Sequence, residues 1–486
     1  MAVLFWISRL YFWTVNAIFA ILNLFRRRHR VSRVTNSLLL ESASSLARKI
    51  SSGELSSEDL VSTFISRIKE VNGLLNSVVR DRFEDALNRA REIDKLVKEK
   101  KLADRDLPFL GVPFTAKDCI FIKDEICTAG IPCRRNAKVD FTADCMRFMI
   151  EAGAIPLAIT NVSECFVGGE AALVSACGSV IGIGSDIGGS IRMPCFFNGV
   201  FGHKPSEFLC PDRGTYPLCY DYQKHMHSVG PICRHAEDLY PMLKVLAGPN
   251  MDKLKPFRQF DWNDSKFFYI EEIVSPMVES LDSELRKSMN SVANYIVTTK
   301  GRSCEKINPS AVHETVEFWL NDMDSKESPS FTQLMADQKG NINPVLELIK
   351  FLLCSSDHTA AAIGLGLIEY ANPIKPDEAA RLEGLRKQLQ QELEQMLGDN
   401  GLLLCATHCV SAPYHVQPLF KPLNFAYTAL FNSLCFPVTQ VPLGLTSSGI
   451  PTGIQVAARR GNDHLTISFA LELEQQFGGW VNFPSG

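Results

Sequence analysis

The first 25 residues form an almost uninterrupted apolar run, and a dense basic cluster follows it. Arg9 is the only charged residue before position 26, and residues 26–30 read Arg-Arg-Arg-His-Arg. A membrane-spanning helix needs about 20 mostly apolar residues, so this segment is long enough if Arg9 extends to the interface. The basic cluster predicts a single-pass membrane anchor over residues 1–30 with the body facing the cytoplasm. The alternatives are a helix lying in the membrane interface and a cleaved signal peptide, which is disfavoured because the charge follows the apolar run.

After this segment the apolar positions alternate between helical and strand-like spacing. Residues 31–42 read as a linker, and no repeat or long Pro/Gly stretch divides residues 43–486, which we predict to be one domain. Amphipathic spacing predicts one helix that starts at Ala43 and a second that follows Ser56 or Ser57 as its N-cap. The same spacing predicts three further helices, at 83–101, 382–397 and 464–477. Short apolar runs predict buried strands at 109–114, 155–160 and 179–184. Strands alternating with helices predict a three-layer α/β/α fold around a central mixed, twisted sheet.

Residues 344–353 and 360–367 are unusually apolar for a surface insertion. We expect them to be buried in the core. The alternatives are that they line an acyl channel or rest on a bilayer.

Composition and charge narrow the function classes. The formal net charge is −4 and the basic residues after position 31 are scattered, so no nucleic-acid partner is indicated. The 15 cysteines are odd in number and irregularly spaced, which favours reduced thiols. Cys405, His408 and Cys409 lack a second ligand pair, and His225 and His227 lack a third ligand, so neither group predicts a metal site.

A glycine-rich segment, Gly182 to Pro194, carries the strongest chemical signal. It lacks the lysine of a phosphate-binding P-loop and the spacing of a dinucleotide fingerprint. It also fails the Gly-x-Ser-x-Gly pattern, because Arg192 stands where the last glycine would be. Gly188 and Gly189 still permit backbone conformations closed to other residues, so consecutive amides can form an anion nest beside Ser190. That is an oxyanion-hole arrangement, although functionless glycine-rich turns are also common.

The residues Gly-Ser-Asp-Ile-Gly-Gly-Ser-Ile-Arg-Met-Pro at 184–194 resemble the central signature of the amidase signature family. Four more blocks resemble further motifs of that family, in family order: Gly111–Asp118 around a lysine, Ala152–Glu164, Gly230–Leu239 and Asn424–Gln455. The matches extend over nearly the whole chain after residue 43. Within the family, Phe196–Pro205 and the membrane-like amino terminus are most similar to the branch that hydrolyses fatty-acid amides.

This resemblance implies a Ser–Ser–Lys triad. Ser190 would be the acylated nucleophile and Lys117 the general base, which works only if burial lowers its pKa towards about 7–8. The other implied residues lie in the same turn: the amides of Ile187, Gly188, Gly189 and Ser190 for the oxyanion, and Ser185, Asp186 and Arg192 as supports. No metal or organic cofactor is implied.

One family feature is missing. The family relays protons through a bridging serine in a Gly-Gly-Ser-Ser-Gly-Gly loop, whereas residues 163–170 read Ser-Glu-Cys-Phe-Val-Gly-Gly-Glu. The serine pair and the loop before it are absent at Val167-Gly168, and neither Ser163, Ser175 nor Ser179 has the family setting. Losing such a relay costs about 10²–10⁴ in rate. A genuine deletion, a splice isoform and a gene-model error would all leave this junction.

The resemblance implies a membrane-associated serine amidase that converts fatty-acid amides to a fatty acid and an amine or ammonia through an acyl-Ser190 intermediate. The missing loop makes a catalytically impaired relative that binds acyl amides the alternative, and restoring a Ser-Ser loop would discriminate the two. A metal-dependent amidohydrolase is a third interpretation, disfavoured by the sparse histidines. The expected partners are a lipid amide and a membrane, and the sequence leaves room for a homo-oligomer.

Overall fold

The structure, a computed structural model, describes residues 2–26, 29–102, 106–163, 168–324, 327–371 and 374–482. Its strands in that part of the chain are β1 (Val78–Asp81), β2 (Pro113–Lys117), β3 (Ile155–Thr160), β4 (Ile181–Asp186), β5 (Phe201–Lys204), β6 (Ser228–Cys233), β7 (Lys266–Ile270), β8 (Cys304–Lys306), β9 (Gly401–Ala406), β10 (Val438–Leu445) and β11 (Pro451–Ala458). They form one sheet in the order β1-β3-β2-β4-β6-β5-β10-β11-β9-β7-β8. Parallel pairs such as β2–β4 and antiparallel pairs such as β4–β6 occur together, so the predicted mixed sheet is confirmed.

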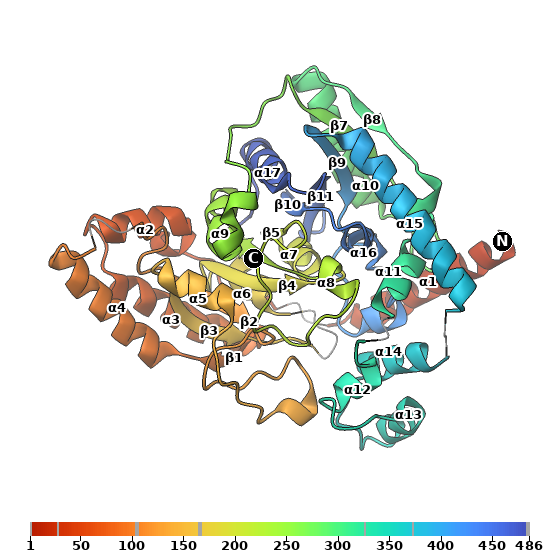
Figure 1. Cartoon of the computed structure of the whole chain (residues 1–486), viewed down its shortest axis with the longest axis horizontal. Coiled ribbons are helices and arrows are strands. Elements are labelled where there is room, and N and C mark those ends of the chain that lie inside the picture. The colour runs from red at the N-terminus through yellow and green to blue at the C-terminus, as the bar shows by residue number, and fades with distance from the viewer. Residues whose placement is uncertain are drawn as a thin grey trace.

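The α-helices cover the sheet and extend beyond it (Figure 1). Their bounds are α1 (Ala2–Asn23), α2 (Ala43–Ser51), α3 (Ser57–Leu75), α4 (Phe83–Lys98), α5 (Asp144–Glu151), α6 (Glu170–Ser175), α7 (Arg192–Asn198), α8 (Gln223–Met226), α9 (Leu239–Ala247), α10 (Ser283–Asn294), α11 (Thr315–Met323), α12 (Phe331–Met335), α13 (Pro344–Leu352), α14 (Ala360–Ala371), α15 (Pro376–Leu397), α16 (Ala426–Ser433) and α17 (Asp463–Phe477). Helices α5, α9 and α17 pack on one another, as do α3, α6 and α7, and both groups contact the sheet. The predicted α/β/α class is confirmed.

Several local predictions can be compared with these bounds. Ser56 caps α3 by accepting the amide hydrogen of Asp59, as expected. The strand predicted from Phe109 starts too early, because β2 begins only at Pro113 and continues to Lys117. Gly111 has φ +71° and an added Cβ there would lie 2.7 Å from Ser57 Oγ, so the preceding residues form a tight turn against α3.

One hydrophobic core contains buried residues from Val34 to Leu473. Leu39, inside the predicted linker, is buried in it, so that segment packs on the body. The predicted domain boundaries at 30 and 42 stay a prediction.

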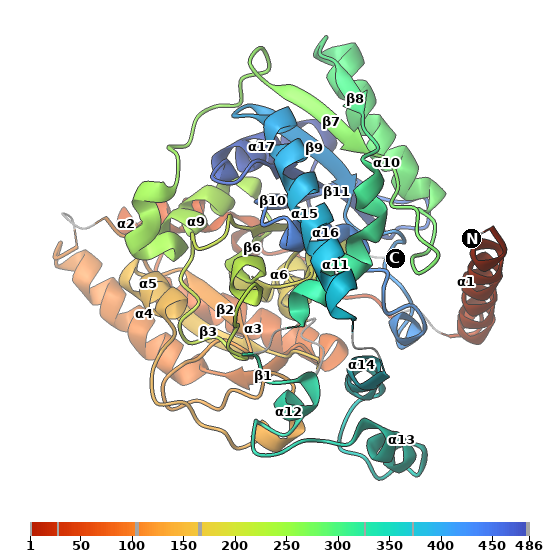
Figure 2. The ribbon, with the colours of Figure 1, turned by 45° about the vertical axis from the view of Figure 1, so that its right-hand side comes forward.

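The expectation that residues 344–353 are core is wrong. Most apolar side chains of α13 are exposed, including Leu346, Ile349 and Leu352. Helix α14 instead contributes Ala362 and Ile363 to a small separate cluster. Figure 2 shows α12, α13 and α14 at one end of the molecule, away from the sheet. A short insertion that does not reach the sheet has too few neighbours to cover all its apolar faces.

Helix α1 is the one helix in the described ranges that is long and apolar enough to cross a membrane, judged by length and composition. It stands at the edge of the molecule in Figure 2. Arg27 and Arg28 of the predicted basic cluster lie outside the described residues.

Candidate active site

Lys117 is the last residue of β2 and its side chain is buried, with 1% of the residue exposed. Burial lowers the pKa of this amine below its ordinary range, against the opposing influence of Cys119, Asp186 and Glu170. A buried amine that sheds its proton easily is suited to accept one from a neighbouring nucleophile.

The predicted nucleophile turn follows β4, the strand beside β2. The two strands are parallel, with Ala116 opposite Ile183, so Lys117 and the turn leave the sheet at the same edge. The turn runs from Ile187 to Ile191 and leads into α7. The structure therefore places the predicted base and the predicted nucleophile, Ser190, at the carboxyl ends of neighbouring strands, where α/β folds commonly position catalytic groups.

Asp186 and Arg192 hold this turn in shape. The Asp186 carboxylate accepts the amide hydrogens of Gly189 at 2.7 Å and Ile191 at 3.1 Å. Arg192 Nε donates to Asp186 at 3.1 Å, and both side chains are fully buried. Burial opposes the charge on Asp186, but the Arg192 guanidinium outweighs it and holds the pKa of that carboxyl well below its usual range. Arg192 also donates to Gln455 at 2.9 Å and Asn432 at 2.5 Å, so each of its three side-chain nitrogens has a hydrogen-bond partner.

Two carbonyl groups of the turn are held by side chains from distant helices. Trp319 Nε1, on α11, donates to the Ile187 carbonyl at 3.0 Å, and Thr428 Oγ1, on α16, donates to the Gly188 carbonyl at 2.7 Å. In a trans peptide the C=O and the N–H of the same plane point in opposite directions. Fixing the Ile187 carbonyl therefore directs the Gly188 N–H away from Trp319.

The four amides predicted for the oxyanion are not equivalent. The Gly189 amide donates to Asp186, so it is not free to bind an oxyanion as predicted. No hydrogen bond of the Ile187, Gly188 or Ser190 amide is found in the described part of the chain. Gly189 has φ +126°, and an added Cβ would lie 2.1 Å from Thr428 Oγ1, so glycine is required there. Gly188 does not have a positive φ, and a Cβ added there would lie 3.1 Å from Trp319 Nε1.

Ser185 and Ser190 occupy different environments. Ser185 is buried and its Oγ lies 3.3 Å from Cys119 Sγ, two residues after Lys117. This contact ties β4 to the chain following β2, consistent with a supporting role. Ser190 is half-buried, which leaves its hydroxyl partly accessible.

Glu170 is a site residue that sequence reasoning did not single out. It begins α6, is buried, and accepts the Thr160 hydroxyl at 2.6 Å as well as the Thr115 hydroxyl. Burial raises its pKa to about 7, although Lys117 opposes the rise. Gly182 makes room for this carboxyl, since an added Cβ there would lie 2.1 Å from Glu170 Oε1. The sequence signal for this residue was a single acidic side chain next to the apolar run at 171–174.

The junction that lacks the serine pair lies directly against the base. A Cβ added to Gly168 would lie 3.4 Å from Lys117 Cε and 3.0 Å from the Asn161 carbonyl oxygen. Val167 and the three residues before it lie outside the described residues. Of the nearby serines, Ser179 bonds Thr115 and the Ile181 carbonyl, and Ser175 bonds the Asn198 carbonyl.

The other sequence candidates have structural partners. His225 Nδ1 lies 2.6 Å from Glu207, and His408 bonds the Val410 carbonyl. No group of three His, Cys, Asp or Glu residues suited to a metal occurs among the described residues, and the cysteines described there are free thiols.

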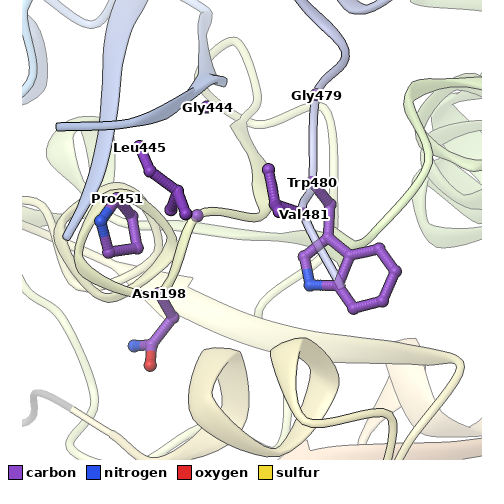
Figure 3. Close-up of a pocket in the computed structure, with 8 residues that line it drawn as sticks. Asn198, Gly444, Leu445, Pro451, Gly479, Trp480 and Val481 are labelled. Atoms are coloured by element: carbon purple, nitrogen blue, oxygen red, sulfur yellow. The ribbon is translucent and has the colours of Figure 1, made fainter. Parts of the chain in front are cut away.

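A shallow pocket lies between the facing ends of β10 and β11, with Leu445 and Pro451, and the C-terminal segment, with Trp480 (Figure 3). Neither Ser190 nor Lys117 lines it. Trp480 Nε1 donates to the Ser175 carbonyl at 3.1 Å, so we interpret this pocket as a gap between packed segments and not as a substrate site.

Comparisons with known proteins agree with this geometry. The Amidase family model matches residues 59–168 and 167–467, two segments that meet at the glycine junction. Fatty-acid amide hydrolase 2-B of Danio rerio is 40% identical over 94% of this chain and 93% of that protein. Fatty-acid amide hydrolase 2 of Homo sapiens is 39% identical over 92% of this chain and 91% of that protein. A solved fatty acid amide hydrolase has a TM-score of 0.73 at 19% identity, over 91% of this chain and 86% of that one, which is a likeness of fold. The chain belongs to the amidase family and is by that membership an amide-hydrolysing enzyme.

Proposed function

We propose that this chain is a membrane-associated serine amidase that hydrolyses fatty-acid amides through an acyl-Ser190 intermediate. The observation that carries the proposal is the pairing of β2 and β4, which brings a buried, easily deprotonated Lys117 to the same sheet edge as the braced turn containing Ser190. The lipid substrate class is supported by relatives named fatty-acid amide hydrolases at 39–40% identity over most of the chain.

In the proposed reaction, the Ser190 hydroxyl oxygen bonds to the amide carbonyl carbon and its proton passes to neutral Lys117. The N–H groups of Gly188 and Ser190 receive the oxyanion, a contribution of about 10²–10³ in rate per donor. The C–N bond then breaks and the leaving nitrogen takes the proton from Lys117. Water, deprotonated by Lys117, attacks the acyl-serine ester and returns Ser190 with a free fatty acid.

Trp319 acts in this proposal as a positioning residue. Its indole N–H holds the Ile187 carbonyl at 3.0 Å and so turns the Gly188 N–H towards the oxyanion. Thr428 fixes the next peptide plane, whose N–H is bonded to Asp186. Of the four amides predicted from the sequence, those of Gly188 and Ser190 act as donors here, and that of Gly189 is bonded to Asp186.

A fluorophosphonate probe, which phosphonylates activated serines, tests the proposal. We expect covalent labelling of the full-length protein that disappears in Ser190→Ala and persists in Ser163→Ala, an exposed serine at the junction. Protein not exposed to the probe should also release fatty acid from a long-chain primary amide faster than it releases acetate from acetamide. Labelling that persists in Ser190→Ala would exclude this serine as the nucleophile.

The second candidate function is an acyl-amide-binding protein with impaired catalysis. It is favoured by one observation: Gly168 lies beside Lys117, at the junction where the sequence lacks the serine pair that the family resemblance implies. Saturable binding of a long-chain amide without labelling or turnover would support this candidate over the first.

A further inference from the structure

Helix α1 has its apolar face outward and a polar face toward the protein, the reverse of an ordinary surface helix. Its outward face is apolar, and the exposed side chains there include Trp6, Leu10, Trp13 and Ile21. Four polar residues lie on the other side, because Ser8, Arg9, Asn16 and Asn23 are all at most half-exposed. Thr14 is exposed, and its hydroxyl donates to the Leu10 carbonyl of the same helix. Phe12 and Val15, which share that inner face, are buried against the body. A helix that turns its polar stripe to the protein presents an apolar surface to its surroundings.

Asn16 is the centre of the contact between α1 and the body. Its Nδ2 donates to Glu279 Oε1 at 2.5 Å, and its Oδ1 accepts from Gln417 Nε2 at 2.9 Å and from Lys421 Nζ. Lys421 and Glu279 form a buried ion pair at 2.7 Å beneath it. We call Asn16, Glu279, Gln417 and Lys421 the polar clamp. The side-chain amide therefore satisfies both partners of a buried charge pair, which is costly to leave incomplete.

Two further contacts secure α1 on either side of the clamp. The Tyr11 hydroxyl donates to the Phe420 carbonyl at 2.8 Å, and the Phe19 and Phe420 rings lie 5.6 Å apart. Both Figure 1 and Figure 2 show α1 beside the chain segment that carries these partners.

A spanning orientation is incompatible with the clamp. The apolar stretch Val3–Asn23 has its midpoint at Trp13, so Asn16 would lie roughly 5 Å from the bilayer centre at 1.5 Å of rise per residue. Glu279 and Lys421 would then have to enter the hydrocarbon with it, or the clamp would have to break. Charged side chains at that depth are strongly disfavoured.

We propose that α1 lies in the plane of the membrane, with its inner face clamped to the body and its outer face inserted among the lipids of a phospholipid bilayer. Trp6 and Trp13 fit the headgroup boundary, where tryptophan is favoured. Arg26 and Arg30, exposed just after the helix, fit anionic headgroups. The amino terminus and the body then lie on the same side of the bilayer, unlike in the single-pass topology predicted from the sequence. This inference rests on the proposed membrane association and specifies its geometry.

Protease protection in sealed microsomes tests this arrangement. One form of the full chain carries an epitope tag at the amino terminus and another carries it at the carboxyl terminus. We expect protease added outside to treat both tags alike, and detergent to expose both. Opposite protection of the two tags would overturn the in-plane arrangement while leaving membrane association intact. A protein that does not float with vesicles containing anionic lipid would overturn the membrane association itself, and the inference with it.

A pair of Asn→Leu variants on α1 tests the clamp. Asn16→Leu removes the clamp contacts, whereas Asn23→Leu raises hydropathy equally but removes only a bond to the helix's own Phe19 carbonyl. We expect Asn16→Leu to move a measurable fraction of amino-terminal tags to the opposite side, and Asn23→Leu to move none. Equal behaviour of the two variants would show that the clamp does not set the topology.

Discussion

The nucleophile turn, Asp186 to Arg192, and the base side, around Lys117, leave the sheet on neighbouring strands but differ in how completely side chains hold them. The turn is bonded at nearly every peptide, by Asp186, by Trp319 and by Thr428. Lys117 instead lies against Gly168, at the junction where the sequence lacks the serine pair that the family resemblance implies. The turn is therefore held on several sides, whereas the junction beside Lys117 consists of glycines without a serine pair.

This difference teaches that a braced oxyanion turn and an activated serine are separate properties. The first needs only fixed peptide planes, which a buried ion pair supplies here. The second needs an unbroken path for one proton between Ser190 and Lys117. The predictions below test the two halves separately.

The largest effect is expected on the base side. Lys117→Met keeps the side-chain volume but removes the amine, so fluorophosphonate labelling of Ser190 should slow by about 10²–10⁴. Lys204 is a matched control, because burial also lowers its pKa, to about 8, and it donates only to the Pro205 and Phe436 carbonyls. Lys204→Met should leave the labelling rate near that of the parent protein in rapid-quench measurements.

The pH dependence of the same reaction follows from the lowered pKa of Lys117. Because the neutral amine is the base, the labelling rate should rise with pH and level off below the ordinary lysine range. That rise should be absent in Lys117→Met. A parent profile that still climbs at pH 10.5 would contradict the effect of burial.

A single substitution can supply a hydroxyl to the incomplete half. Gly168 does not have a positive φ, and a Cβ there would touch the Lys117 side chain at 3.4 Å, so Gly168→Ser places a hydroxyl beside the base. We expect labelling to accelerate by about 10–10², part of the full worth of a proton relay. Gly168→Ala adds the same Cβ without the hydroxyl and should give no acceleration.

The comparison fails if the two junction variants behave alike. Equal rates in Gly168→Ser and Gly168→Ala would mean that a hydroxyl at this position does not complete the proton path.

Glu170 links the base side to pH-dependent stability. Its pKa is raised from 4.5 to about 7, so the folded state holds a proton that the unfolded state has lost. Its stabilising contribution is full below pH 4.5 and disappears as pH rises through about 7. Between pH 4.5 and about 7, the free energy of unfolding of Glu170→Gln should therefore fall by roughly 1–3 kcal/mol less than that of the parent protein. Denaturant titrations at several pH values measure it.

Glu474 provides the control for that measurement. Its pKa is likewise raised to about 7 by burial. Glu474 lies on α17, however, and accepts the amide hydrogen of Ala236. Glu474→Gln should flatten the same stability window and leave the pH profile of Ser190 labelling unchanged. A changed labelling profile in this variant would show that the pH dependence of labelling does not come from Lys117 alone.

The smallest effect is expected in the braced half. Trp319→Phe keeps the ring over Gly188 but loses the hydrogen bond to the Ile187 carbonyl, worth about 1 kcal/mol, so labelling should slow by up to about tenfold. Phe425 stacks edge-on against Trp319 at 4.8 Å, and Phe425→Leu preserves the indole donor. That control should slow labelling less than Trp319→Phe does.

The sequence by itself determined the local features of this protein. Residues such as Gly189 and the pair Asp186–Arg192 could be identified because a positive φ and a buried charge each admit few residue types, and these leave a recognisable pattern. Strand and helix types followed from hydrophobic spacing, and the missing serine pair was visible directly in residues 163–170.

Only the tertiary structure decided which distant groups meet. Trp319 and Thr428 lie more than a hundred residues from the turn they hold, and Asn16 meets Glu279 and Lys421 across the length of the chain. Hydropathy counts apolar residues and carries no information on which side of α1 faces the body. A hydrogen bond depends on the position of both partners, and those positions exist only once the sheet, its helices and their loops have packed together.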